Sequence, residues 1–334
     1  MGGQTLSNAI VVQSGGIAGS GTLSGEISGA GNLTKSAAGV LELTAANSYG
    51  ATTVSNGTLR LSGSGTLGVG AVTVSGGTLD LNGVTLAKDI SLSGGKLTGA
   101  SSLSGSVTLT ADSAASGTLS ANLALGTDYA RVLDITDGLD VSGTLSGVGT
   151  LTGGDLTVSG THAVGNSPGY QLVEGNVTYA ANSLFVWEFE DDGTFDIFGP
   201  QRPSLAGTGN YDAVDVTGNL IVSAGAILQL NALLANPELA YTGELWNLEA
   251  GVVFQVFSVD GTIDGLFTFA NGTQTEAVEG FGVWTIRREN LALGETAGVY
   301  LSYAPVPEPS TYGLMLGGLA LAGAAIRRRR AKRA

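Results

Sequence analysis

The chain has 334 residues, with 54 glycines, no cysteine, 43% hydrophobic and 13% charged residues, and a formal net charge of −14. This balance excludes an intrinsically disordered chain, and the lack of cysteine excludes disulfides and thiolate metal sites. Residues 1–307 hold 8 Lys and Arg against 27 Asp and Glu, a net charge of −19. This charge disfavours binding to nucleic acid. It suits binding to divalent cations or neutral glycans, or it serves only to keep the protein soluble.

The first residues lack the features of a signal peptide. Met1-Gly2-Gly3-Gln4 leads into neither a basic segment nor an apolar one. Because the other end of the chain indicates export, as described below, we expect a signal peptide and further repeats upstream of Met1.

Residues 1–165 are repetitive and contain only two aromatic residues, Tyr49 and Tyr129. The segment 53–61 is nearly repeated 20 residues later by the segment 73–81. A fixed period near 20 residues is typical of solenoids. The tripeptide Gly-Thr-Leu marks the repeats, at residues 21–23, 57–59, 65–67, 77–79, 117–119, 143–145 and 149–151.

The residues within each repeat predict short strands. Val54, Leu59 and Leu61 alternate with polar residues, the pattern of a half-buried strand. Asn56-Gly57 and Gly76-Gly77 supply the positive φ angles that tight corners need. We therefore expect an all-β parallel β-helix of roughly eight turns and about 40 Å, with Leu and Val inside. A stack of hairpins is the alternative.

Residues 27–61 resemble the autotransporter-associated β-strand repeat, and the rest of 1–165 does so loosely. The resemblance lies in Ile27-Ser28-Gly29-Ala30-Gly31-Asn32-Leu33 and its continuation through Gly57-Thr58-Leu59-Arg60-Leu61. It implies a right-handed parallel β-helix of the kind found in exported passenger proteins.

Residues 166–304 have a different composition, with 18 of the 21 aromatic residues of the chain. Alternating apolar residues continue at 211–230, 252–257 and 267–269, which predicts further strands. Residues 166–230, with the turn Asn166-Ser167-Pro168-Gly169 and the segment from Tyr211 to Leu220, also resemble passenger proteins. We expect a β-rich continuation or cap of the first region, built as a wider coil or a capping sandwich.

His162 is the single histidine, so it is the one candidate for the histidine of a catalytic triad, with Asp155 or an acidic residue elsewhere in the chain as its acid. No Gly-x-Ser-x-Gly sequence is present to supply the nucleophile. We expect His162 to be a turn residue between Gly160 and Gly165.

The densest acidic cluster consists of Glu188, Glu190, Asp191, Asp192 and Asp196. Extension of residues 185–189 would place Glu188 and Glu190 on one face of a strand, with 191–193 as its turn. The last four of these residues are weak candidates for calcium ligands, and a solvated hairpin tip is the preferred interpretation. The spacing matches neither an EF-hand nor a calcium-binding nonapeptide repeat, and we expect no bound metal or other cofactor.

Residues 305–334 form a tail of three unlike parts. Pro305, Pro307 and Pro309 predict a stiff spacer. Residues 312–326 carry no charge and predict a short transmembrane helix of about 22 Å. A cytoplasmic charge anchor follows, made of Arg327, Arg328, Arg329, Arg330, Lys332 and Arg333.

This tail resembles a PEP-CTERM sorting signal, in the order and spacing of its Pro-Glu-Pro triplet, apolar helix and arginines. The resemblance implies processing near Val306, Pro307, Glu308 and Pro309 by an exosortase-type membrane transpeptidase. It implies a membrane-anchored precursor, then a protein of the envelope surface or the extracellular space of a Gram-negative-type bacterium.

Together these features favour a non-enzymatic structural or adhesive protein of the exopolysaccharide matrix or of contacts between cells. The alternative is a polysaccharide-active β-helix enzyme, a lyase or hydrolase, with its site in residues 166–304. Such an enzyme would need two close carboxylates and a basic residue in one cleft.

Overall fold

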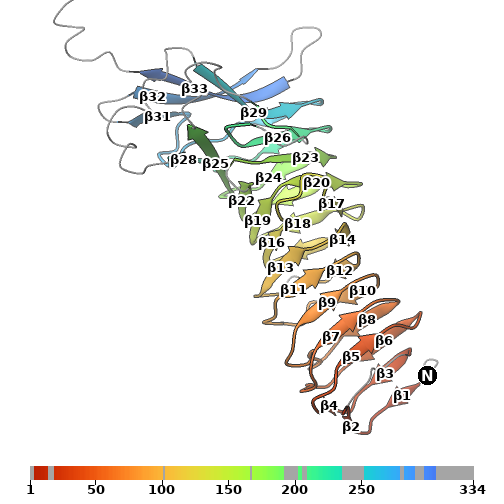
Figure 1. The fold of residues 1–334 in the computed structure, drawn as a ribbon. Coiled ribbons are helices and arrows are strands. Elements are labelled where there is room, and N and C mark those ends of the chain that lie inside the picture. Colours follow the sequence, from red (N-terminus) through yellow and green to blue (C-terminus); the bar gives the residue numbers. More distant parts are fainter. Residues whose placement is uncertain are drawn as a thin grey trace, which may run out of the picture.

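The computed structural model describes residues 4–13, 19–100, 102–165, 168–191, 202–204, 209–234, 252–278, 282–289 and 297–305. These residues form strands and turns without any helix, which confirms the all-β prediction. Figure 1 shows the strands stacked in successive layers from β1 to β29, with β31, β32 and β33 beyond them.

The strands are arranged in three large sheets and one pair. Sheet 1 has 15 strands, in the order β1 (Thr5–Leu6), β3 (Gly21–Leu23), β6 (Val40–Leu43), β8 (Thr58–Leu61), β10 (Thr78–Asp80), β12 (Lys96–Thr98), β14 (Ser113–Ala115), β17 (Val132–Asp134), β20 (Gly149–Thr152), β23 (Tyr170–Glu174), β26 (Ala213–Val216), β29 (Val252–Val259), β33 (Ala297–Pro305), β32 (Gly282–Glu289) and β31 (Thr275–Val278).

Sheets 2 and 3 form the other sides of the coil. Sheet 2 has 10 strands: β5 (Leu33–Lys35), β7 (Thr52–Val54), β9 (Val72–Val74), β11 (Ile90–Leu92), β13 (Ser106–Leu109), β16 (Asn122–Ala124), β19 (Thr144–Gly147), β22 (Thr161–Val164), β25 (Leu184–Asp191) and β28 (Ile227–Leu234). Sheet 3 has 6: β15 (Gly117–Leu119), β18 (Leu139–Val141), β21 (Leu156–Val158), β24 (Val177–Tyr179), β27 (Leu220–Val222) and β30 (Ile263–Gly265). The pair is β2 (Ile10–Val11) with β4 (Ile27–Ser28).

Every strand of sheet 1 from β3 to β23 pairs in parallel with the strand one turn earlier, 17 to 22 residues back in the chain. Parallel pairing is the signature of a solenoid and contradicts the hairpin alternative. Residues before 165 contribute about nine turns, close to the eight expected.

Leucine columns and glycine corners hold the turns in register. Leu59, Leu79 and Leu97 are register partners and are all buried. At the corner before these strands, a Cβ atom on Gly77 would lie 2.7 Å from the carbonyl oxygen of Gly57. A Cβ atom on Gly95 would likewise lie 2.7 Å from the carbonyl oxygen of Gly77. Glycine is therefore required at these two stacked corners.

The sheets cross residue 165 without a break, but the turns become longer. The steps from β23 to β26, from β24 to β27 and from β25 to β28 are all 43 residues. The steps from β26 to β29 and from β27 to β30 are again 43. The second region is thus a continuation of the coil, with turns about twice as long.

A column of polar side chains fixes one corner of these long turns. The Asn176 side-chain oxygen accepts a hydrogen bond from the Asn219 backbone N–H at 2.8 Å, and that of Asn219 accepts one from the Thr262 N–H at 2.9 Å. Each of these residues follows a glycine, Gly175, Gly218 and Gly261. This repeat was not predicted from the sequence.

The coil ends in an antiparallel cap. Strand β33 pairs antiparallel with β29 and β32, and β32 pairs antiparallel with β31 (Figure 1). Under the cap, Trp187, Phe254, Trp284 and Tyr303 are buried with ring centroids 5.0 to 5.8 Å apart for the contacting pairs. The excess of aromatic residues after 165 therefore fills the wide end of the core.

Within the described residues, no helix has the length and apolar character needed to cross a membrane. The helix expected at 312–326 lies outside the described residues.

We predict that Leu79→Ala lowers the free energy of unfolding by about 2–5 kcal/mol, because it opens a cavity in a column of stacked leucines. Urea denaturation followed by circular dichroism measures the change. The control is Thr78→Ala on the neighbouring outward position, expected to change stability by about 0.5 kcal/mol or less. Equal losses in the two variants would contradict the column as the source of stability.

Candidate functional site

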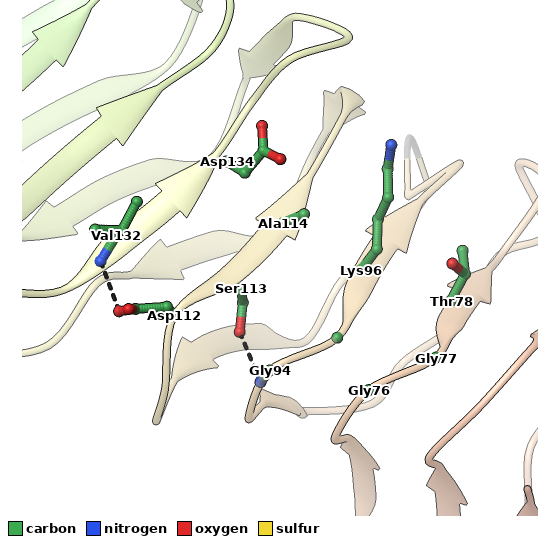
Figure 2. A pocket seen from close by; sticks show the side chains of 11 residues that line it. Gly76, Gly77, Thr78, Gly94, Lys96, Asp112, Ser113, Ala114, Val132 and Asp134 are labelled. Atoms are coloured by element: carbon green, nitrogen blue, oxygen red, sulfur yellow. Dashed lines mark hydrogen bonds between the residues drawn. The ribbon is translucent and has the colours of Figure 1, made fainter.

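A groove of about 460 Å³ lies on the outer face of sheet 1, across β10, β12, β14 and β17. Thr78, Lys96, Ala114 and Asp134 are register partners in these four strands. Figure 2 shows their side chains on the same face of the sheet. With parallel strands about 4.8 Å apart, this row of four is about 14 Å long.

The groove is hollow because the residues along it are small. Ala114 leaves a gap between Lys96 and Asp134, and the corner beside the strands includes Gly76, Gly77 and Gly94 (Figure 2). Gly95 also lines the groove. The stacking that requires glycine at 77 and 95 thus also keeps side chains out of the groove.

Lys96 and Asp134 place opposite charges on the two sides of Ala114. The Lys96 ammonium is 2.5 Å from a carboxylate oxygen of Asp137. Asp134 accepts hydrogen bonds from the hydroxyl and the backbone N–H of Thr136, at 2.6 and 2.8 Å. These bonds, the hydroxyl first, hold the pKa of Asp134 below its usual value, so its carboxylate stays charged at neutral pH.

Two other lining residues hold the corners of the coil. The Asp112 carboxylate accepts a hydrogen bond from the backbone N–H of Val132 at 2.9 Å. The Ser113 hydroxyl accepts a hydrogen bond from the backbone N–H of Gly94 at 3.0 Å (Figure 2). The groove therefore offers a hydroxyl, an ammonium and a carboxylate in one row. That set suits hydrogen bonding to a hydroxyl-rich ligand.

The sequence analysis did not identify this groove. The matching segments Gly77-Thr78-Leu79 and Gly95-Lys96-Leu97 place Thr78 and Lys96 in one column. The next member is the sequence Ser113-Ala114-Ala115, which lacks the Gly-x-Leu pattern, so the column could not be followed further.

His162 is not a turn residue, and that prediction was wrong. It lies within β22, where it pairs in register with Leu145 and Phe185, and it is completely buried. Nor does it contact Asp155, whose carboxylate accepts hydrogen bonds from Asn176 at a corner of sheet 3. The candidate triad is therefore not assembled.

The His162 ring is held by two polar partners in the core. The Gln171 side-chain N–H donates to the Gly147 carbonyl at 2.7 Å, which turns its oxygen towards His162 Nε2, 2.8 Å away. Nε2–H is therefore the donor, and Nδ1 accepts from the Tyr179 hydroxyl at 2.5 Å. This arrangement needs a neutral ring, and burial lowers the pKa of His162 to about 4.

Of the acidic candidates, Glu188 alone has a side chain that the structure describes. Glu188 accepts a hydrogen bond from the Asn231 side chain at 2.7 Å. Asp191 was expected in a turn, but its backbone belongs to β25 and pairs with Leu234. The side chains of Glu190 and Asp191, and the whole of Asp192 and Asp196, lie outside what the structure describes. Among the described side chains, no group of three His, Cys, Asp or Glu gathers as a metal site.

We predict that protonation of His162 makes the fold acid-sensitive. The pKa of His162 is 6.5 in the unfolded chain and about 4 in the folded chain. At a pH between these values, His162 is protonated in the unfolded chain and neutral in the folded chain. Stability is therefore complete above pH 6.5 and falls towards pH 4, by about 3 kcal/mol at most. The check is urea denaturation at pH 7.5 and pH 4.5, comparing the wild type with His162→Phe and His162→Gln. Equal pH dependence in all three would disprove it.

The candidate residues of the tail, from Val306 to Pro309 and from Arg327 to Arg333, lie beyond the last described residue. Residues 305–330 match the family model described as the PEP-CTERM protein-sorting motif, which confirms the resemblance of the tail. None of the curated proteins with which the sequence was compared matches it. The motif implies an exosortase-dependent protein, made as a secreted and membrane-anchored precursor and processed for the cell surface or the extracellular space.

Proposed function

We propose that this chain is a non-enzymatic structural or adhesive protein of the cell envelope, associated with an exopolysaccharide matrix or with neighbouring cells. The observation that carries the proposal is the attachment of a sorting motif at residues 305–330 to the last strand of a long solenoid. The motif routes the chain outwards, and the solenoid supplies an extended surface there.

The route follows from the tail. Residues 312–326 hold the precursor in the membrane, and the cluster from Arg327 to Arg333 keeps its end cytoplasmic. An exosortase-type enzyme then cuts near Val306–Pro309. We further propose a Gram-negative-type envelope, and a right-handed coil of the autotransporter-associated type. The resembling residues 27–61 support that coil, since they span five consecutive strands, β4 to β8.

The surface supports binding to hydroxyl-rich material. A net charge of −19 on residues 1–307 repels nucleic acid and anionic polymers, whereas the groove of Thr78, Lys96, Ala114 and Asp134 presents hydrogen-bonding groups in a row. A neutral polysaccharide is the matrix component that suits both features.

The groove also supports a role without catalysis. Its two carboxylates, Asp112 and Asp134, both accept backbone N–H groups that shape the coil. A cleaving pair would need one of them as a proton donor or a free base. The polysaccharide-active enzyme remains the alternative outcome of the binding experiment below.

We predict that exosortase-type processing shortens the chain at the tail. Intact-mass measurement of envelope material should show loss of residues beyond the cut in cells that contain the enzyme, and the full chain in cells without it. Replacing Pro307, Glu308 and Pro309 together by alanine should leave the chain at full mass, whereas Ser310→Ala should be processed normally. A full-length wild-type chain in the enzyme-containing cells would refute the route.

We predict that filling the groove weakens binding to isolated exopolysaccharide. Ala114→Trp should raise the dissociation constant about tenfold, equivalent to about 1.4 kcal/mol or one or two hydrogen bonds. Val40→Trp is the matched control, since Val40 is an exposed residue of the same sheet outside the groove. Equal affinity of the two variants would exclude the groove as the contact, and release of new sugar ends would favour the enzyme.

A further inference from the structure

Strand β33 is an interior strand of the cap. It lies between β29 and β32 and runs antiparallel to both. Each of its residues pairs in register with a residue of at least one of these two neighbours. Its inward side chains, Ala297, Val299, Leu301 and Tyr303, are all at most 3% exposed. The Tyr303 ring lies 5.0 Å from that of Trp284. The strand is thus part of the core and not a loose end of the chain.

The sorting motif starts on the last residue of this strand. Pro305 pairs with Gly282 at the end of the sheet, and the match to the sorting motif also begins at 305. Proline has no N–H to give to a sheet. Because Pro307 and Pro309 follow, every second residue from 305 to 309 lacks an N–H, so a regular continuation of the strand would have no donors along one of its two edges.

The distance from the sheet to the motif is short. Val306–Pro309 lies within four residues of Pro305, at most about 14 Å of extended chain. An enzyme that cuts there has to bring its reacting atom to about 3–3.5 Å from the scissile carbonyl. Strand β32, beside β33, has 8 residues and extends about 27 Å. The enzyme would have to accommodate the edge of the folded cap along with the peptide.

The geometry points to an order of events, which rests on the processing proposed above: the enzyme acts on the chain only while β33 is out of the sheet. Processing breaks one peptide bond, transfers the acyl group to water, which gives a carboxylate, or to an acceptor amine, which gives an amide, and releases the tail with a free amino group. The closed cap is not a substrate. Closure after the cut makes the new end a direct extension of an interior strand.

Engineered disulfides test this order, because the chain has no cysteine of its own. The cap lock is Val253→Cys with Ser302→Cys, register partners in β29 and β33. The control lock is Ser91→Cys with Thr108→Cys, register partners in β11 and β13 within the coil. Neighbouring strands bring such pairs within disulfide range. Each folded full-length precursor is incubated in detergent with membranes that contain an exosortase-type enzyme.

We expect the oxidised cap lock to be processed at least about tenfold more slowly than the same protein in dithiothreitol, since the link removes the open population. The control lock should be cut at the same rate in both conditions. Eight Gly and Ser residues inserted between Pro305 and Val306 add up to about 27 Å of reach and should restore processing of the locked cap.

The outcomes separate this inference from the proposed function. If the wild-type chain is never cut, the proposed function fails. If the wild type is cut and the oxidised cap lock is cut equally fast, processing stands and the inference is overturned. A locked cap that remains uncut with the spacer also overturns it, because closure of β33 would then not be the obstacle.

Discussion

The fold depends on stacking each corner of the chain on the corner one turn earlier. Most strands of the regular turns have two to four residues, too few to be stable alone, so their hydrogen bonds come from neighbours about 20 residues away. Such pairing works only if successive corners have the same shape. The contacts of Gly57, Gly77 and Gly95 show why glycine fills these corners. The glycine content is therefore a consequence of the stacking and not a sign of flexibility.

The Gly-Thr-Leu repeat was enough to predict an all-β solenoid, because it reports an inward leucine just after a corner. It does not report which side of the coil that leucine belongs to. The copies at 57–59, 117–119 and 143–145 lie in sheets 1, 3 and 2 respectively. A groove depends on which residues share one column of one sheet, so the row of Thr78, Lys96, Ala114 and Asp134 needed the register seen in the structure.

Two errors came from reading residue types without their alignment to the previous turn. His162 is polar and lies between glycines, but it occupies the position of Leu145 one turn earlier, which is an inward position. The 43-residue repeat was missed because a period of about 20 was already established. Aligning Gly175-Asn176-Val177 with Gly218-Asn219-Leu220 reveals it from the sequence alone. Whether a polar residue of a solenoid points inwards or outwards is best predicted from the residue at the same position one turn earlier.

The last turn of the coil has no further turn to pair with, unlike the regular turns before it. A parallel turn always leaves an open strand edge, which invites another turn or another molecule. Beyond β29, sheet 1 continues with β33, β32 and β31, which pair antiparallel. Pro305 then ends β33 at the residue where the sorting motif begins. The last paired residue of the sheet is thus also the first residue of the segment that matches the sorting motif.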